Sequence, residues 1–380
     1  MHIAIDIRNL ARARSGIARA IENACLALVD DNHRLSLFCS GKLHPDFSAL
    51  KELSNATIYE SDCVTPVQRV VWGSRDLPKY VTTIQPDVFW APAHRLSSRL
   101  AHNVPCALTV HDSVWRQAPG TMRLHRLAAE YALSARAIAA AHVVMTVSRN
   151  SAAELKKLQP RSRNKTLIVP NITHRTAAGP TSETILEGPD DLPSDYCLFV
   201  GTLEPRKNLG RLIDAFMAVP PNIRGSLSLV IAGGDGWKSK SVKDRIARHS
   251  EYVKWVGRVS EAELSQLYSK CRFVVMPSLY EGFGYPAIEA EARGKLVVIS
   301  KDTSLDEVSS STAIKVDPLE TASITGGLVA ALSAKPSPRD VEIRTESASR
   351  FGSETVLPLL IGAFDMAIER FHEGKSTKSL

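Results

Sequence analysis

Short runs of Val, Ile and Leu recur along this chain of 380 residues, and stretches with apolar residues at helical spacing lie between them. Such continuous apolar runs are typical of parallel strands that are buried on both faces of a sheet. In the first half of the chain the runs cover residues 2–7, 34–39, 56–61, 87–92, 106–112, 142–148 and 166–171. Helical stretches such as 17–29 and 122–141 alternate with them, which predicts βαβ units in a doubly wound sheet.

The same pattern restarts in the second half, after a polar segment that contains Gly and Pro. There the runs cover residues 197–203, 227–234, 253–257, 273–278, 296–300 and 312–317. A chain of this length exceeds what one hydrophobic core usually supports. We therefore expect an α/β protein of two Rossmann-like domains, residues 1–174 and 196–350, joined by a linker over 175–195. Because such sheets bind ligands beyond the carboxyl ends of their strands, we expect the site in a cleft between the two domains.

The composition excludes several classes of protein. Apolar residues make up 44% of the chain and charged residues 23%, which is ordinary for a globular protein and excludes wholesale disorder. The cysteines lie far apart, with no CxxC pair, so we expect neither a disulfide framework nor a structural zinc, and a reducing cytoplasm is the natural setting. Asp6 and Arg8 interrupt the apolar region that a signal peptide would need, and no window approaches the apolar length of a membrane span.

Charge is unevenly distributed along the chain. Residues 1–180 hold 23 Lys and Arg against 13 Asp and Glu, whereas residues 181–380 hold 24 against 27. This asymmetry suggests that the first half faces an anionic lipid surface, a phosphorylated substrate or a nucleic acid, and a solvated Arg-rich surface is the alternative. We expect no nucleic-acid partner, because the basic residues come without a recognisable recognition motif.

The sharpest motif, EGFGYPAIE, follows an apolar run and spans Glu281 to Glu289. Two glutamates at this spacing mean little alone, so the information lies in the Gly-Phe-Gly-x-Pro between them. The glycines let backbone amides approach a ligand closely. A helix that begins with Pro286 in its first turn would favour a negatively charged group such as a phosphate.

Two other interpretations of this motif stay open. Gly282, Gly284 and Ala287 also fit the dinucleotide fingerprint GxGxxA, with Asp302 about 20 residues further on. That fingerprint normally occupies the opening βα turn of a Rossmann domain, whereas this motif follows the fourth run of the second half and contains a proline. An NAD-dependent or nucleotide-sugar-modifying enzyme and a purely structural turn are therefore the alternatives.

A second motif, GTLEPRKN, begins at Gly201 after the first apolar run of the second half. Its adjacent Arg206 and Lys207 combine a bidentate fork with a point charge at a helix entrance, which suits a diphosphate. In the first half, His111 stands beside Asp112 at the end of a run. A structural histidine and a solvated basic pair are the respective alternatives.

A glycine-containing turn, Ser15-Gly16, follows the first run and leads into a helix. It offers backbone amides to a ligand, although Ser15 could serve simply as a helix cap. The sequence has no GxxxxGK[ST] loop, HExxH, DxD or GxSxG motif, so P-loop hydrolysis, zinc proteolysis and serine hydrolysis lose support.

Taken together, these motifs resemble the retaining glycosyltransferases of GT-B fold, in the group that includes bacterial mannosyltransferases of O-antigen, capsule and exopolysaccharide synthesis. The similarity covers nearly the whole chain, through DIRNL…SGIAR, LTVHD, TVSRNS, IVPN, FVGTLEPRKN, VGRVSEAELSQLY, PSLYEGFGYPAIEA, SLDEV and VDP. The form DxR…GIxR is most similar to mannosyltransferases that use GDP-mannose. The resemblance implies transfer of mannose to a glycan or lipid-diphosphate-linked acceptor, with a UDP-sugar donor or a catalytically silent subunit of a transferase complex as alternatives.

The resemblance also implies roles for individual residues. Glu281 would contact the donor sugar and stabilise charge near its anomeric carbon, and His111 would contact the sugar near its 6-position. Glu289 would hold the ribose hydroxyls, while Arg206 and Lys207 would bind the diphosphate without a metal ion or another cofactor. The remaining implied donor-site residues are Gly16, Gly201, Phe283, Gly284, Tyr285 and Pro286.

For the fold, the resemblance implies two domains facing across a cleft and a final helix, within residues 351–380, that returns to the first domain. For the location, we expect a cytoplasmic protein with peripheral contact to the anionic inner face of the plasma membrane through Arg123, Arg126 and Arg136. The chain departs from the family pattern at EAEARGKLVV, at Ser15-Gly16 and at RFGSE. None of these departures removes a charged donor-site residue, so we expect activity.

Overall fold

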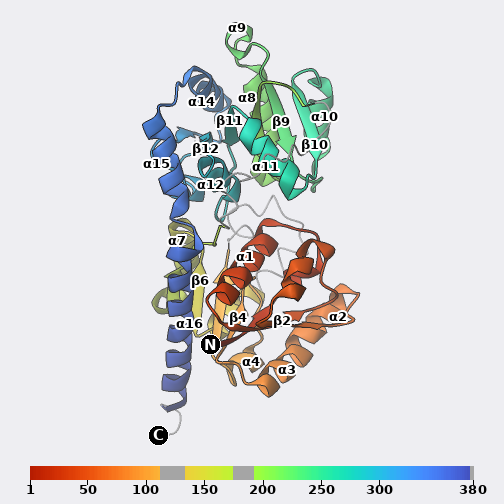
Figure 1. The fold of residues 1–380 in the computed structure, drawn as a ribbon, viewed down its shortest axis with the longest axis vertical. Coiled ribbons are helices and arrows are strands. Elements are labelled where there is room, and N and C mark those ends of the chain that lie inside the picture. The colour runs from red at the N-terminus through yellow and green to blue at the C-terminus, as the bar shows by residue number, and fades with distance from the viewer. Residues whose placement is uncertain (112–132, 174–191, 377–380) are drawn as a thin grey trace. The chain divides into compact units, whose positions relative to one another are not determined.

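The computed structural model describes residues 1–111, 133–173 and 192–376, which fall into two compact units (Figure 1). Unit 1 contains residues 1–111, 133–173 and 351–376, and unit 2 contains residues 192–350. Each unit is built on one parallel sheet, with seven strands in unit 1 and six in unit 2. The predicted α/β class, with two sheets of Rossmann type, is confirmed.

The sheet of unit 1 has the strand order β3-β2-β1-β4-β5-β6-β7. Every neighbouring pair is parallel, and β1 is the third strand, where Ile3 pairs with Leu35 on one side and Val88 on the other. The strands are β1 (His2–Asp6), β2 (Arg34–Cys39), β3 (Ala56–Glu60), β4 (Val88–Ala91), β5 (Cys106–Val110), β6 (Val143–Thr146) and β7 (Thr166–Ile168). Most of the predicted runs are longer than these strands, because residues such as Ile7, Val147 and Val169 stay buried in the loops that follow them.

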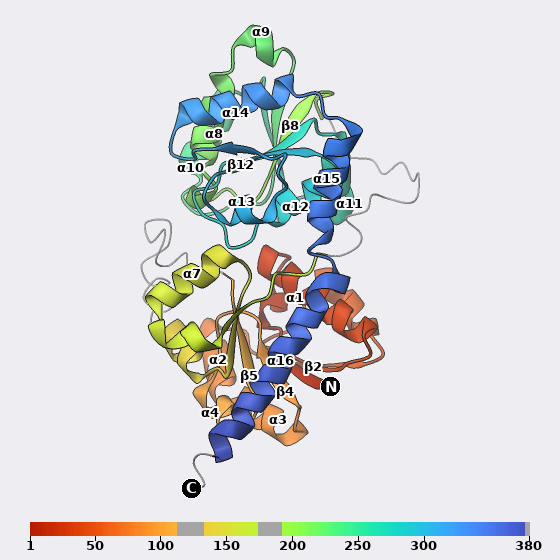
Figure 2. The same cartoon turned by 90° about the vertical axis from the view of Figure 1, so that its left-hand side faces the viewer.

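Helices cover both faces of this sheet (Figures 1 and 2). They are α1 (Gly16–Asp30), α2 (Pro66–Val71), α3 (Leu77–Ile84), α4 (Ser98–Ala101), a segment over 133–140, α7 (Arg149–Leu158) and α16 (Ser353–Ser376), with shorter helical turns at η1 (Arg8–Ala11), η2 (Pro45–Glu52), η3 (Trp72–Asp76) and η5 (Pro160–Lys165). Helix α1 begins where Ser15 accepts a hydrogen bond from the Ala18 amide at 3.3 Å, which is an ordinary N-cap.

The last helix completes the core of unit 1. Val356, Leu360 and Phe364 of α16 are buried in the same apolar cluster as Ile21 and Leu28 of α1. Figure 2 shows α16 lying across β4 and β5. A segment that follows unit 2 in sequence therefore supplies part of the core of unit 1.

The expectation that no window approaches the apolar length of a membrane span is wrong for the stretch that holds α15 and α16 (338–376). Among the described residues, this stretch is long and apolar enough to cross a membrane by length and composition alone. A core helix of a globular protein passes the same test. Since Ala363, Phe364 and Ala367 are almost fully buried in the core of unit 1, we interpret α16 as a core helix.

The sheet of unit 2 has the strand order β10-β9-β8-β11-β12-β13, again with parallel neighbours. Its strands are β8 (Tyr196–Val200), β9 (Ser228–Ala232), β10 (Val253–Gly257), β11 (Phe273–Met276), β12 (Leu296–Ser300) and β13 (Ile314–Val316). Its helices are η7 (Pro205–Lys207), α8 (Leu209–Met217), α9 (Pro221–Arg224), α10 (Lys240–Arg248), α11 (Glu261–Lys270), α12 (Tyr285–Glu291), α13 (Ser304–Val308), α14 (Thr321–Ser333) and α15 (Pro338–Ser349).

In each sheet the strand order reverses once. In unit 1 the chain moves outward from β1 to β2 and β3 on one side and then resumes on the other side with β4. In unit 2 it moves from β8 to β9 and β10 and resumes with β11. The loops after the two central strands leave in opposite directions at such a point, which is where open α/β sheets bind ligands. The loops after β8 and β11 carry both predicted motifs of the second half.

The packing of α16 predicts how strongly unit 1 depends on it. Phe364 is fully buried and its ring centroid lies 5.8 Å from that of Trp90. We expect Phe364→Ala to lower the free energy of unfolding by about 3–5 kcal/mol, because it removes a buried ring and leaves a cavity. Leu359→Ala, at a residue of the same helix that is 48% exposed, is the control and should change it by less than about 1 kcal/mol. Equal effects of the two changes in urea unfolding would contradict this placement.

Candidate functional site

Four charged side chains meet in unit 2 at the carboxyl ends of β8 and β11. The Nζ atom of Lys207 lies 2.5 Å from Oε1 of Glu281, and Arg206 Nη1 donates to the other carboxylate oxygen, Oε2, at 2.8 Å. The second terminal nitrogen of Arg206, Nη2, lies 2.6 Å from Oε1 of Glu204. Two carboxylates therefore face two cations, in a chain that runs from Glu204 through Arg206 and Glu281 to Lys207. We call these four residues the charge cluster.

The backbone around the charge cluster holds Lys207 in place. Gly201 follows β8 with φ of 154°, and a Cβ atom there would lie 3.2 Å from Cε of Lys207. The absence of a side chain at Gly201 therefore leaves room for the lysine stem. Asn208, with φ of 60°, ends η7, and its side-chain nitrogen donates to the carbonyls of Pro277 at 2.9 Å and Pro318 at 2.7 Å. These bonds tie the loop after β8 to the loop after β11.

Glu281 is fixed from several sides and is only 7% exposed. Ser278 Oγ donates to its Oε1 at 2.8 Å, and Ser304 Oγ donates to its backbone carbonyl at 2.6 Å. Burial alone would raise the pKa of Glu281, but the charges of Lys207 and Arg206 and their hydrogen bonds lower it to about 2. Glu281 is therefore an ionised carboxylate at neutral pH. Burial lowers the pKa of Lys207 in turn, and the Glu281 carboxylate opposes that shift.

The glycine-rich part of the motif forms the entrance to α12. Gly284 is the N-cap with φ of 114°, and a Cβ atom there would lie 2.5 Å from Leu305 Cδ2, so only glycine fits. Pro286 lies in the first turn of the helix, as predicted. The rings of Phe283 and Tyr285 contact each other edge to face at 5.3 Å between centroids.

The second glutamate of the motif, Glu289, lies in α12 and is 5% exposed. It is thus a buried residue of the same helix that the glycines open. Glu289 and Glu281 both belong to unit 2, on either side of the Gly284 cap. Its expected contact with ribose hydroxyls stays a prediction.

In unit 1 His111 lies just past β5 and is buried. Its Nε2 lies 2.7 Å from the carbonyl oxygen of Pro92. A carbonyl only accepts hydrogen bonds, so Nε2 carries the proton in this arrangement. The amide of His111 donates to Nε2 of His94 at 3.1 Å, and Ser151 Oγ donates to the carbonyl of His111 at 3.3 Å. These bonds hold His111 beside the ends of β4 and β5, and its expected sugar contact stays a prediction.

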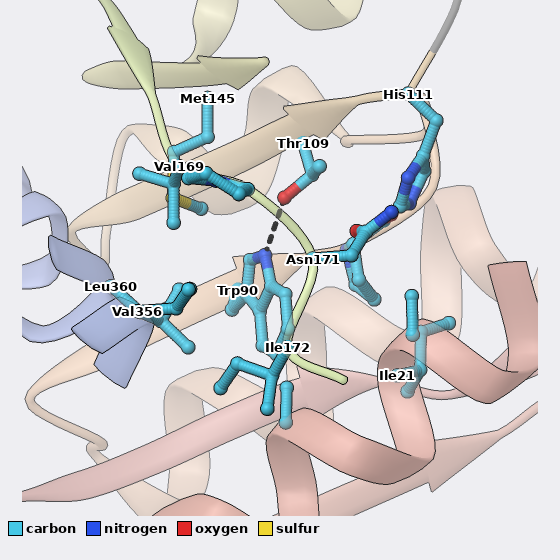
Figure 3. Close-up of a pocket in the computed structure, with 14 residues that line it drawn as sticks. Ile21, Trp90, Thr109, His111, Met145, Val169, Asn171, Ile172, Val356 and Leu360 are labelled. Atoms are coloured by element: carbon cyan, nitrogen blue, oxygen red, sulfur yellow. Dashed lines mark hydrogen bonds between the residues drawn. The ribbon is translucent and has the colours of Figure 1, made fainter. Parts of the chain in front are cut away.

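His111 also lines a cavity in unit 1 between α1, α16 and the sheet. Figure 3 shows His111 at one end of the cavity, with Val356 and Leu360 at the other, and Trp90 Nε1 donating to Thr109 Oγ1 at 2.9 Å between them. The cavity measures ≈ 20 Å³, room for about one water molecule. It is therefore too small to hold a sugar in this structure.

Several other predicted positions can be placed. Gly16 is exposed at the start of α1, with open space where a side chain would begin. Arg136 is exposed in the segment 133–140, whereas Arg123, Arg126 and Asp112 lie outside the described residues, as does most of the expected linker. Within the described ranges, no group of three or more His, Cys, Asp or Glu side chains is placed to hold a metal ion.

Glu204 belongs to the charge cluster and Ser278 contacts it, but neither was predicted as a site residue, although both lie within or beside the predicted motifs. Arg206 and Lys207 were predicted to bind a ligand and Glu281 a sugar, and these roles stay predictions; that the three side chains pair with one another was not predicted. The available signal was weak: an acidic residue two positions before a basic pair is common on surfaces. The extended backbone at Glu204, followed directly by η7, brings its carboxylate beside Arg206.

Two family models match this chain. The model described as Glycosyltransferase Family 4 matches residues 14–174, and the one described as Glycosyl transferases group 1 matches residues 188–342. The first match falls largely in unit 1, and the second covers most of unit 2. The charge cluster and the EGFGYPAIE motif thus lie within the group 1 match.

Known proteins resemble this chain in sequence or in structure. The O-antigen chain mannosyltransferase B of Escherichia coli is 34% identical over 139 residues, which make up 36% of this chain and 36% of that enzyme. The chain thus spans about a third of the length of this curated relative. Anabaena HepE, solved in complex with UDP and glucose, superimposes with a TM-score of 0.65 at 17% identity, covering 99% of this chain and 100% of HepE.

WaaG, a glycosyltransferase involved in lipopolysaccharide biosynthesis, superimposes with a TM-score of 0.68 at 14% identity, covering 96% of this chain and 99% of WaaG. At these identities the structural matches establish the fold alone.

The low pKa of Glu281 predicts how the stability of the protein depends on pH. Since the pKa falls from an ordinary 4.5 to about 2 on folding, the ionised carboxylate stabilises the folded chain above pH 4.5, and this contribution is lost as pH falls towards 2. We expect Glu281→Gln to lower the free energy of unfolding by roughly 3 kcal/mol at pH 7, and this difference from wild type to shrink between pH 4.5 and pH 2.

Denaturant unfolding at a series of pH values measures this difference. Glu342→Gln, at an exposed glutamate paired with Arg339, is the matched control and should show a difference below about 1 kcal/mol at every pH. A Glu281→Gln difference that does not change with pH would show that the carboxylate is not held ionised as described.

Proposed function

This chain belongs to the glycosyltransferases of GT-B fold, with a family 4 domain followed by a group 1 domain, and from that premise we propose that it transfers mannose from GDP-mannose to a glycan or lipid-linked acceptor. The proposed setting is synthesis of a cell-surface polysaccharide. The single observation that carries the proposal is the position of Arg206 and Lys207 at the switch point between β8 and β11. The similarity to an O-antigen chain mannosyltransferase supports the choice of sugar.

The proposed chemistry begins at the bond between the sugar and the diphosphate. When that bond breaks, positive charge develops on the anomeric carbon and negative charge on the departing diphosphate. Arg206 and Lys207 stabilise the leaving group through charge-assisted hydrogen bonds. They supply two positive charges themselves, so we propose that the reaction needs no metal ion or other cofactor.

We propose that the transfer retains the configuration of the sugar. The acceptor hydroxyl attacks from the face that the diphosphate leaves, through a short-lived oxocarbenium-like state, and passes its proton to the diphosphate. A covalent intermediate on Glu281 is disfavoured, because both of its carboxylate oxygens already accept hydrogen bonds, from Arg206, Lys207 and Ser278. A carboxylate held by these donors would have to give up its partners before it could attack the anomeric carbon.

The other proposed donor contacts follow the motifs. Glu289 holds the ribose hydroxyls, and His111 contacts the donor sugar near its 6-position. Glu281 contributes its ionised charge near the anomeric carbon and keeps Arg206 and Lys207 oriented towards the diphosphate. The amides around Phe283, Gly284, Tyr285 and Pro286, together with Gly16 and Gly201, line the phosphate and sugar site.

Of two alternatives, one has an observation in its favour. A UDP-sugar donor would leave the enzyme class unchanged. The similar structure of HepE, which was solved with UDP and glucose, supports this alternative. A catalytically silent subunit of a transferase complex would keep the fold and lose the activity. The ordered charge cluster around Glu281 argues for an active enzyme over a silent one.

We also propose that unit 1 contacts the anionic inner face of the plasma membrane from the cytoplasmic side. Four exposed valines recur at helical spacing in α2 and just before it. They are Val64 (80% exposed), Val67 (72%), Val70 (56%) and Val71 (45%). An exposed apolar face on a unit rich in Lys and Arg suits the surface of an anionic bilayer. Such contact would bring the enzyme to a lipid-diphosphate-linked acceptor.

Nucleotide binding tests the donor assignment. We expect calorimetric titration without added metal to give tight binding of GDP and weaker binding of UDP, ADP and NAD. Arg206→Ala should weaken GDP binding by about 10-fold to 100-fold, since it removes a charge-assisted contact to the diphosphate. Arg339→Ala removes an exposed arginine that pairs with Glu342, and it should leave the affinity unchanged.

Other results would change the assignment in defined ways. Preference for UDP would keep the enzyme class and overturn the choice of GDP-mannose. Preference for NAD, with no effect of Arg206→Ala, would contradict the proposed function.

Binding to vesicles tests the membrane contact. We expect vesicles that contain anionic lipid to retain the protein at low salt, and the double change Val67→Asp with Val70→Asp to reduce retention at least about 5-fold by placing charge on the apolar face. Leu319→Asp, at an exposed leucine of unit 2, is the matched control and should bind like wild type. The hypothesis fails if anionic vesicles do not retain the wild-type protein in flotation.

A further inference from the structure

Arg206 lies between two carboxylates, and the proposed function uses only one of them. Nη1 donates to Glu281 at 2.8 Å, while Nη2 lies 2.6 Å from Oε1 of Glu204. Glu204 is the residue just before η7, in the loop that follows β8. The two ends of one guanidinium are thus engaged by two different acidic residues.

The two carboxylates are held to different degrees. Glu281 accepts hydrogen bonds from Lys207 and Ser278 as well as from Arg206, and its side chain is 7% exposed. Glu204 contacts Arg206 through Oε1, and its side chain is 18% exposed. Its loop position and greater exposure allow Glu204 to move into solvent, whereas movement of Glu281 would leave Lys207 buried and unpaired.

The second carboxylate in the charge cluster opposes the binding of an anionic ligand. The diphosphate of a nucleotide carries negative charge, and both cations of the cluster are already neutralised by Glu204 and Glu281. In a partly buried site, like charges at a few ångströms repel one another strongly. The diphosphate therefore binds more favourably if one of the two carboxylates breaks its ion pair and moves away when the diphosphate binds.

We infer that Glu204 is a displaceable counter-ion of Arg206, which holds the guanidinium in the free protein and yields Nη2 to the diphosphate of the nucleotide. The inference rests on the proposed function, since it assumes that Arg206 binds a diphosphate. Glu281 keeps its bonds to Lys207 and Ser278 throughout. When the product nucleoside diphosphate departs, Glu204 returns to Arg206 and competes with rebinding, so Glu204 sets the affinity for the nucleotide and assists its release.

The change Glu204→Gln tests this inference. The amide oxygen of glutamine still accepts a hydrogen bond from Arg206, so the substitution removes the charge and keeps the positioning contact. We expect the dissociation constant of GDP or UDP, whichever wild type binds more tightly, to fall about tenfold in calorimetric titration. The matched control, Glu342→Gln, removes the same charge from an exposed ion pair and should change the dissociation constant by less than about twofold.

A double-mutant cycle assigns the effect to Arg206. In an Arg206→Ala background, Glu204→Gln should no longer tighten binding, because the counter-ion has lost its partner. Binding that is unchanged or weaker in Glu204→Gln, while wild type binds in an Arg206-dependent manner, would overturn the inference and leave the proposed function standing. If wild type binds neither GDP, UDP nor ADP, the proposed function and the inference both fail.

Discussion

The buried ion pair between Glu281 and Lys207, extended by Arg206, is the interaction on which the site depends. A carboxylate and an ammonium that are each less than 10% exposed are tolerated only when they are paired and hydrogen-bonded. Removing one partner of such a pair typically destabilises a protein by about 3–5 kcal/mol, because the other charge stays buried. The pairing therefore stabilises the loops after β8 and β11 against each other, at the switch point of the sheet.

The same pairing prepares the site for its proposed chemistry. Arg206 and Lys207 are held with defined orientations before any nucleotide arrives, so little reorganisation is needed when negative charge develops on the leaving group. The two loops are joined by Asn208, whose amide binds the carbonyl of Pro277, and by the bond from the Leu279 amide to the carbonyl of Arg206. A partly buried carboxylate at Glu204 completes the charge balance of the free protein and can leave without breaking the buried pair.

Much of this fold follows from local sequence patterns. The apolar runs mark the strands of both sheets, since the central parallel strands are buried on both faces and need continuous Val, Ile and Leu. Pro286 marks the first turn of α12. The loops that carry Arg206 and Glu281 were predicted for the same reason, because functional residues follow strand ends. What could not be predicted is the contact between them. Residues 206 and 281 are brought together because β8 and β11 are neighbours in the sheet. Local sequence spacing does not indicate that Glu281 and Glu204 are the partners of Arg206.

The account as a whole depends on what Arg206 touches when a nucleotide is bound. A crystal structure of the protein with its preferred nucleoside diphosphate is the most direct measurement. We predict diphosphate oxygens within hydrogen-bonding distance of Arg206 and Lys207, Glu204 turned away from Arg206, and Glu281 still bonded to Lys207 and Ser278. A diphosphate bound away from Arg206, with both carboxylates of the charge cluster still in place, would contradict the account.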